Sequence, residues 1–434
     1  MCEASVVVKV EDINAVKKKL FFDVPWVDVK KELDACYRDM GIKAKIKGFR
    51  PGKVPRKILE SRFKDHVEEE AINNLINKYY WDALKGRGII AVSQPDIHQN
   101  GIEQDNKFSF DATVEVEPVI EPKDYIGLEL EKEEKEVTEN DIEARLQQIR
   151  QMFGTLEDMT DEREVKLGDF AMIDFAGTLD GEQIKEMTSD NYLIEIGAGT
   201  FVPGFEEHVV GMSKGQTKNV QVRFPDEYRM PRIAGKEISF SITLKGVKEK
   251  KLPELDDNFI RNFNKFETLE DLKDEVRRNL EEENKTESEM ALHNLIVTKL
   301  LEANHFEAPP SFIERQISYM IADVKREMVS RGMNRKEIEE ISVNYREIYK
   351  DEATKIVKTF LLLKNIALKE SMTVDDDVIN SRIREMAQRR GQDFDSLKKS
   401  LEDDNILEGI VAEILNEKVI EFIKEKANIH QPSK

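Results

Sequence analysis

The chain contains few cysteines and histidines. Among its 434 residues are 2 cysteines and 6 histidines. Two thiols, Cys2 and Cys36, in so long a chain are typical of a reducing compartment rather than of a disulfide-stabilised scaffold. The histidines do not show the spacing of metal ligands. We therefore expect no structural metal and no cofactor.

Export and membrane signals are also missing. Residues 1–5 offer neither a basic start nor an apolar stretch, so the sequence predicts no secretory signal. The apolar run at 360–363 ends at Lys364, far short of the roughly 20 residues that span a bilayer. These absences predict a cytoplasmic protein with no membrane contact.

Acidic residues outnumber basic ones, 87 to 67, for a formal net charge of -20. Charged residues make up 35% and apolar residues 39% of the chain, a composition typical of folded rather than disordered protein. A chain of this length exceeds one ordinary core, so we expect several domains.

One short segment departs from the acidic balance. Residues 43–57 contain no carboxylate, and their cations are Lys43, Lys45, Lys47, Arg50, Lys53, Arg56 and Lys57. Glycines and prolines at 48, 51, 52 and 55 interrupt helix and strand alike. The pattern predicts an exposed basic loop displaying Phe49, suited to phosphate or to an acidic protein surface.

Two other interpretations of this loop compete. A nucleotide P-loop has four residues between its glycines and a Ser or Thr after the lysine, whereas here three residues separate Gly48 from Gly52 and Val54 follows Lys53. The other interpretation is a solvated basic turn without a binding partner. Phe49 argues against that turn, because aromatic and Arg side chains together commonly anchor interfaces.

Residues 1–116 predict an α+β domain. Strands are expected at 5–10 and 18–24, followed by a helix that Gly41 ends. After the basic loop, a long helix has an apolar face running from Val67 to Tyr80. Residues 108–116 alternate apolar and polar side chains, as in a half-buried strand.

Residues 160–249 predict a domain of short strands. These are expected at 168–177, 192–196, 216–224 and 238–245, with a hairpin turn at Asp180-Gly181. Residues 197–206 form a loop that enters a short helix ended by Gly211. This loop is not a dinucleotide motif, because Val202 occupies the third glycine position.

From Pro253 onward the chain predicts helices arranged as extended arms. Thr268 and the stretch 373–376 indicate helix starts, and Pro309-Pro310, Gly332 and Gly391 indicate breaks. The apolar faces of these helices fit packing between helices. Any that stay exposed would suit weak binding of unfolded chains, for which Met320, Met328 and Met333 are adaptable side chains.

The run Gly-Phe-Arg-Pro-Gly-Lys-Val-Pro at 48–55 resembles the signature of the bacterial trigger factor family, and the later domains agree with it. The resemblance implies an ATP-independent chaperone that docks at the ribosomal exit tunnel. It implies a connector at 117–159 that packs with a helical chaperone domain at 250–434. Expected partners are ribosomal protein and rRNA, and unfolded nascent chains; a homodimer off the ribosome stays open. The ribosome-binding residues would be Lys45, Lys47, Gly48, Phe49, Arg50, Pro51, Gly52 and Lys53.

The loop at 197–206, the run Phe-Pro-Asp-Glu-Tyr at 224–228 and the strand around Phe240 resemble the FK506-binding (FKBP) type of prolyl isomerase. The resemblance implies an FKBP-like antiparallel β-sheet with a short helix. Its catalytic pocket would be lined by Phe175, Ile184, Tyr192, Phe201, Val202, Phe205, Tyr228 and Phe240. Lys185 stands where many members carry Asp. Taken singly, each aromatic residue fits an ordinary core equally well.

Two further function hypotheses remain beside the ribosome-associated chaperone. One is a stand-alone prolyl isomerase whose helical region serves dimerisation or substrate delivery. The other is a periplasmic chaperone built from similar parts, which the missing signal and the basic loop disfavour. The leading hypothesis predicts α+β, β and all-α domains in one chain.

Overall fold

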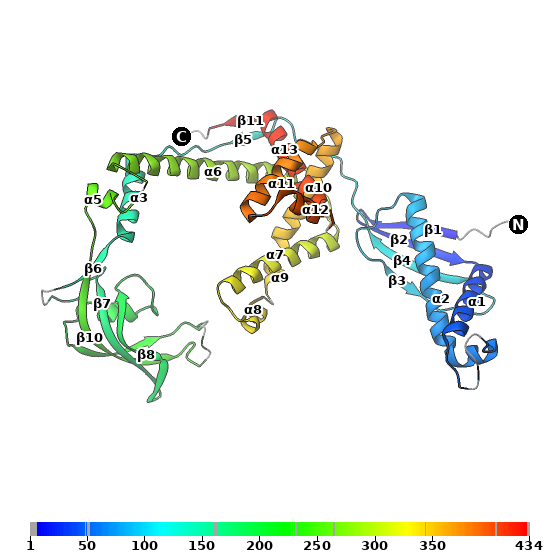
Figure 1. Cartoon of the computed structure of the whole chain (residues 1–434), viewed down its shortest axis with the longest axis horizontal. Helices are drawn as coiled ribbons and strands as arrows, with labels where there is room; N and C mark the ends of the chain where they lie inside the picture. Colours follow the sequence, from blue (N-terminus) through cyan, green and yellow to red (C-terminus); the bar gives the residue numbers. More distant parts are fainter. Residues whose placement is uncertain are drawn as a thin grey trace. The chain divides into compact units, whose positions relative to one another are not determined.

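The computed structural model describes residues 7–47, 49, 53–159, 163–226, 228, 230, 232–263, 265–342, 344–403 and 406–431. The chain forms two compact units, one of residues 1–133 and 290–434 and the other of residues 134–289. Figure 1 labels most of the helices and strands of both units.

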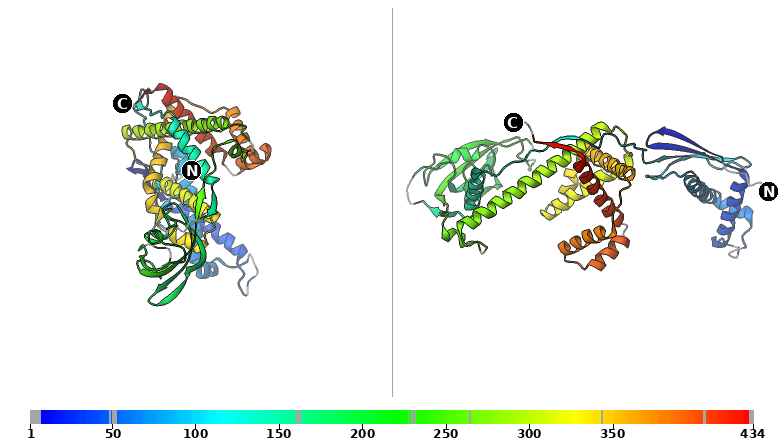
Figure 2. Two further views of the ribbon diagram at one scale, coloured as in Figure 1. Left: turned by 90° about the vertical axis from the view of Figure 1, so that its left-hand side faces the viewer. Right: turned by 90° about the horizontal axis from the view of Figure 1, so that it is seen from above.

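The N-terminal part of the first unit is an antiparallel sheet with two helices on one face. Its strands lie in the order β1 (Val7–Asn14), β2 (Lys17–Val24), β4 (Phe108–Glu115) and β3 (Asp96–Gln99). The buried residues of β4 alternate with half-buried ones, because successive side chains point to opposite faces. They share one core with α1 (Trp26–Lys43) and α2 (Arg56–Arg87), and Figure 2 shows both helices on the same side of the sheet.

The predicted strands at 18–24 and 108–116 and the long helix are confirmed. The predicted end of the first helix at Gly41 is wrong: α1 continues to Lys43, and the Ala44 N–H donates to Met40 O at 2.8 Å. A glycine inside a helix costs about 1 kcal/mol relative to alanine. Position 41 lies against Leu59 of α2, and packing of the two helices outweighs that local preference.

The rest of the first unit is mainly helical. Residues 290–303 of α6 (Leu269–Ala303) belong to it, with α10 (Lys350–Lys369) and α13 (Leu407–Lys426). These three helices share a core with Ile120, Tyr125 and Leu130. The other helices are α7 (Pro310–Ser330), α8 (Arg335–Ser342), α9 (Tyr345–Ile348), α11 (Asp376–Arg390) and α12 (Phe394–Asp403).

One short parallel pair accompanies these helices, β5 (Glu129–Glu131) with β11 (Asn428–His430), and the sequence did not predict it. The predicted helix boundaries are confirmed at Pro310, Gly332 and Gly391. Thr268 also caps α6, since its Oγ1 accepts the Asp271 N–H at 3.2 Å. At the start of α11, the N-cap Asp375 makes no side-chain capping bond.

The second unit contains a five-stranded antiparallel sheet. β6 (Thr155–Asp158), β10 (Glu237–Lys251), β7 (Phe170–Leu179) and β8 (Glu182–Glu195) lie in that order, and β9 (Thr217–Arg223) also pairs with β10. The short helix α4 (Phe205–Val209) packs against its core. Separately, α3 (Glu139–Met152) and α5 (Asp257–Ile260) pack with the first part of α6.

The hairpin turn predicted at Asp180-Gly181 is confirmed, with φ of 53° and 85°. The strand predicted to begin at residue 192 begins instead at Glu182. Two register shifts between β7 and β8 interrupt the side-chain alternation, so the first part of β8 carries no clear period in the sequence.

Candidate functional site

Phe175 of β7 lies at the centre of a group of rings in the second unit, hereafter the aromatic cluster. Its ring centroid is 5.3 Å from that of Phe201, 5.5 Å from Tyr192, 5.8 Å from Phe205 and 6.2 Å from Phe240. The rings meet mainly edge to face, the geometry that aromatic quadrupoles favour. Residues from β7, β8, β10, α4 and the loop before α4 therefore meet in one place.

The members of the aromatic cluster differ in exposure. Phe205 and Phe240 are 0% and 1% exposed, so they form its floor, and Phe175 is 6% exposed. Tyr192 is 38% exposed and Phe201 is half-buried, so these two rings lie at the surface. Tyr192 and Phe201 are therefore the accessible rings of the aromatic cluster, and Phe205 and Phe240 lie beneath them.

The other three residues predicted for the pocket lie around the aromatic cluster rather than among its rings. Ile184 and Val202 are buried in the same core as the aromatic cluster. Tyr228 packs on Phe224 with centroids 4.8 Å apart, and the Phe224 ring lies 6.3 Å from Phe240. Five of the eight residues are thus buried in one core, and Phe201 and Tyr228 are partly buried against it. Tyr192 is exposed, and its ring contacts that of Phe175.

Gly177 allows β7 to approach the floor of the aromatic cluster. A Cβ at this position would lie 2.9 Å from Phe240 Cε1 and 2.9 Å from Met187 Cβ. Gly177 is also the cross-strand partner of Phe240. A larger residue here would displace the Phe240 ring.

Two buried carboxylates in this domain had no signal in the sequence. Asp169 accepts two hydrogen bonds from the Arg163 guanidinium, at 2.6 and 2.7 Å. Burial opposes its charge, but Arg163 and the Lys166 N–H hold the pKa of Asp169 below its ordinary value. The second is Glu206 of α4, 7% exposed. Neither lies in a periodic pattern, and only their three-dimensional neighbours distinguish them from surface acids.

The basic loop has a firmly packed base. Ala44 and Ile46 are each 7% exposed and belong to the core of the N-terminal domain. The Phe49 N–H donates to Ile46 O at 3.1 Å, and the Phe49 side chain is 38% exposed. Lys45, Lys47 and Lys53 are exposed as well. The predicted residues Gly48, Arg50, Pro51 and Gly52 lie outside the described residues.

Arg56, one of the seven cations of residues 43–57, makes contacts within the N-terminal domain. Its Nη1 lies 2.7 Å from Asp34 Oδ1, its Nε lies 2.7 Å from Glu60 Oε1, and its guanidinium stacks 4.1 Å from the Tyr37 ring centroid. These contacts tie the start of α2 to α1. Arg56 is therefore an anchor of the loop rather than part of its tip.

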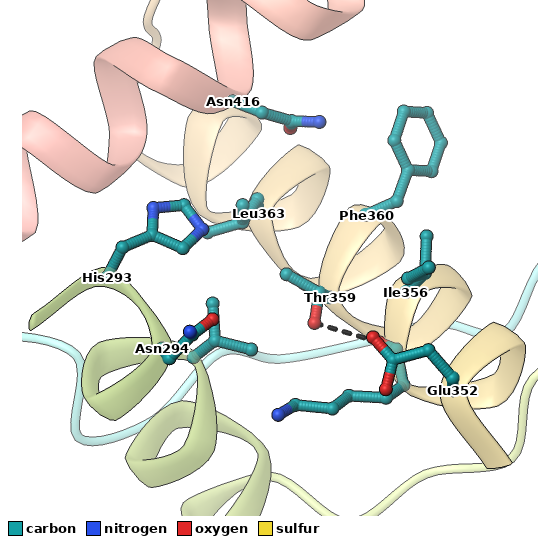
Figure 3. A pocket seen from close by; sticks show the side chains of 10 residues that line it. His293, Asn294, Glu352, Ile356, Thr359, Phe360, Leu363 and Asn416 are labelled. Atoms are coloured by element: carbon teal, nitrogen blue, oxygen red, sulfur yellow. Dashed lines mark hydrogen bonds between the residues drawn. The ribbon is translucent and has the colours of Figure 1, made fainter. Parts of the chain in front are cut away.

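Two pockets open along α10 in the first unit. One, of about 340 Å³, lies between α6, α10 and α13, and Figure 3 shows His293, Asn294 and Asn416 converging on it from α6 and α13. The other, of about 260 Å³, lies between α7 and α10. Ile356 and Phe360 line both pockets.

The residues that the structure describes hold no group of three or more His, Cys, Asp or Glu placed to bind a metal ion. Among the same residues, no helix combines the length and apolarity needed to cross a membrane.

This is a multidomain protein, and its five-stranded sheet, short helix and aromatic cluster together form a prolyl isomerase domain. The family model "FKBP-type peptidyl-prolyl cis-trans isomerase" matches residues 161–245, and those for bacterial trigger factor protein and its C-terminus match residues 6–149 and 268–425. The chain belongs to the trigger factor family. It is a chaperone with a ribosome-binding N-terminal domain and an FKBP-type isomerase domain.

Individual relatives agree along the whole chain. Trigger factor of Syntrophus aciditrophicus is 49% identical over 430 residues, covering 99% of this chain and 97% of that protein. Trigger factor of Syntrophotalea carbinolica is 38% identical over 432 residues, covering 98% and 97%. A solved structure of the trigger factor chaperone shares 20% identity with a TM-score of 0.48, covering 96% of this chain and 99% of that one. The family models and the two trigger factor sequences confirm the family resemblance inferred from the sequence.

Proposed function

We propose that this protein docks at the ribosomal exit tunnel through its basic loop, shelters nascent chains along its helical region and isomerises X-Pro bonds at the aromatic cluster. It works without ATP in the cytoplasm. Residues 1–116 bind the ribosome, residues 160–249 isomerise X-Pro bonds and residues 250–434 shelter nascent chains. Residues 117–159 are the connector. Within the connector, residues 117–133 belong to the first compact unit and residues 134–159 to the second.

The observation that carries the docking proposal is the exposed Phe49 among lysines. Because Ala44 and Ile46 are buried, the fold fixes the base from which Phe49 projects. The exposed Lys45, Lys47 and Lys53 suit rRNA phosphates. In this proposal Phe49, Arg50 and Lys53 contact the ribosome. The full ribosome-binding set is Lys45, Lys47, Gly48, Phe49, Arg50, Pro51, Gly52 and Lys53.

The aromatic cluster suits isomerisation without an acid, a base or a metal. Rotation about an X-Pro bond breaks amide resonance against a barrier of about 20 kcal/mol. The twisted amide is less polar than the planar one, so a water-poor aromatic wall favours the twisted form. Each tenfold of rate requires about 1.4 kcal/mol of this difference.

We assign the catalytic pocket to the eight residues that the family resemblance indicates. Tyr192 and Phe201 contact the substrate, since they are the partly exposed rings. The buried Phe205 and Phe240 form the floor, and a backbone N–H near Val202 orients the carbonyl. The complete set is Phe175, Ile184, Tyr192, Phe201, Val202, Phe205, Tyr228 and Phe240.

Unfolded chains would bind along the exposed apolar residues of the helical region. Tyr319 is 62% exposed, and Ile356 and Phe360 are 37% and 36% exposed between the two pockets of α10. The half-buried Met320 and Met328 lie on α7, where flexible side chains can adapt to varied clients.

The deciding experiment is co-sedimentation with purified bacterial ribosomes across a salt series. We compare the intact protein with a combined Phe49→Ala, Arg50→Ala, Lys53→Ala variant. The control combines Val27→Ala, Lys30→Ala and Lys31→Ala, which also removes one apolar side chain and two cations. Val27, Lys30 and Lys31 are exposed on α1 in the same domain.

Saturable binding that weakens with salt should be lost, by about tenfold or more, only in the loop variant, because interface energy concentrates in aromatic and Arg anchors. Intact protein that stays in the supernatant at low salt would defeat the docking proposal and favour the stand-alone isomerase. Equal losses in both variants would assign binding to overall charge.

A further inference from the structure

Glu206 is a buried carboxylate with three backbone donors. Its Oε2 accepts the N–H of Gly197 at 2.9 Å and that of Gly199 at 3.0 Å. Its Oε1 accepts the Phe201 N–H at 3.2 Å. One side chain of α4 therefore holds three backbone groups of the loop that precedes the helix.

This carboxylate stays ionised although it is buried. Burial penalises the charge, but the backbone N–H groups of Gly199, Phe201 and Gly197 hold the pKa of Glu206 below its ordinary value. Hydrogen bonds to a charged acceptor are about twice as strong as neutral ones. The hydrogen bonds of the loop therefore favour the ionised form of Glu206.

The held loop carries two residues of the proposed pocket. Gly197 and Gly199 have φ of 95° and 66°, and glycines leave a free loop many alternative conformations. The Phe201 ring lies 4.2 Å from Phe205, centroid to centroid, and the Phe205 N–H donates to Val202 O at 3.0 Å. The position of Phe201 at the surface of the aromatic cluster thus depends on how residues 197–201 are fixed.

We propose that Glu206 is a positioning residue of the isomerase: its carboxylate selects the one loop conformation that sets Phe201 and Val202 against the substrate proline. The inference rests on the proposed catalytic pocket. Glu206 does not touch the substrate, since it is 7% exposed. It acts through Phe201, whose placement determines how well the pocket fits the twisted amide.

The test compares Glu206→Gln with Glu207→Gln in the full chain. Both positions lie on α4, but Glu207 is exposed. On an X-Pro peptide, Glu206→Gln should lower kcat about tenfold and change KM less than about twofold, because a displaced Phe201 weakens interactions of the transition state. Glu207→Gln should keep wild-type kinetics.

Amide hydrogen exchange separates positioning from a loss of stability. In Glu206→Gln, peptides covering residues 197–201 should exchange faster, while those of β7 and β10 keep their wild-type rates. Wild-type kcat, or faster exchange throughout the sheet in proportion to the lost activity, would overturn the proposal. Should this variant unfold the domain, Glu206→Asp replaces it, since the shorter side chain keeps the charge but cannot reach all three donors; wild-type kcat there would equally overturn it.

Exchange in the unaltered protein provides a test that needs no variant. The amides of Gly197, Gly199 and Phe201 should be protected, and exchange at unprotected rates would contradict the role of Glu206. If the unaltered protein shows no X-Pro turnover at all, the proposed isomerase pocket fails. If it turns over substrate and Glu206→Gln does so equally well, only the positioning role fails.

Discussion

At the scale of single residues, exposure alone does not distinguish the proposed site from its surroundings. Tyr192 and Leu193 are adjacent on β8 and are 38% and 39% exposed. Tyr192 pairs with the buried Ile173 and its ring contacts Phe175, whereas Leu193 pairs with Met172. Because successive strand residues face opposite sides, only Tyr192 reaches the aromatic cluster.

These neighbours provide a matched test of the pocket. Tyr192→Ala should lower kcat/KM on an X-Pro peptide about tenfold, because it opens one aromatic wall to water at a cost of about 1.4 kcal/mol. Leu193→Ala should leave kcat/KM unchanged. A protease-coupled isomerisation assay measures both, and equal effects of the two substitutions would remove Tyr192 from the pocket.

At the scale of elements, the floor of the aromatic cluster depends on close contact between β7 and β10. Phe240 of β10 lies opposite Gly177 of β7, and the missing side chain leaves room for its ring. The apolar period of β10 was readable in the sequence, since residues 238–244 alternate strictly. The role of Gly177 was not, because it depends on a residue 63 positions away in the chain (240 − 177).

Gly177→Ala should therefore destabilise the isomerase domain by about 1–3 kcal/mol, the usual cost of overpacking, and lower its turnover. Gly246→Ala is the control, since a Cβ there would meet nothing within 4 Å. Differential scanning calorimetry of the full chain is the suitable measurement, because Trp26 and Trp81 both lie in the N-terminal domain. An unchanged transition for Gly177→Ala would show that Phe240 can shift freely.

At the scale of the whole molecule, the two proposed activities belong to different compact units. Phe49 and Lys53 lie in the unit of residues 1–133 and 290–434, and the aromatic cluster lies in that of residues 134–289. Effects of substitutions at sites that share no contacting residues usually add within about 0.5 kcal/mol. The ribosome-binding loop and the isomerase pocket should thus be separable by substitution.

Combining Phe49→Ala and Lys53→Ala with Tyr192→Ala tests this separation. The combined variant should show the ribosome affinity of the loop variant and the kcat/KM of Tyr192→Ala. The parent variants are its controls, in the same sedimentation and peptide assays. A loss of ribosome affinity on adding Tyr192→Ala would reveal coupling between the two activities.

The sequence by itself determined whatever depends on near neighbours in the chain. Periods of two in β4 and β10, the turn at Asp180-Gly181 and the breaks at Pro310 and Gly391 are local, since backbone preferences and side-chain alternation act over a few residues. The family signature at 48–55 is equally local. These features predicted the domain types and the position of the basic loop.

Only the tertiary structure decided what depends on residues distant in sequence. It continued α1 past Gly41, used Arg56 as an anchor and paired β5 with β11. It also buried Phe205 and Phe240 while leaving Tyr192 exposed. Burial and hydrogen bonding are properties of neighbours in space, and no local pattern records that the carboxylate of Glu206, rather than that of Glu207, meets three backbone donors.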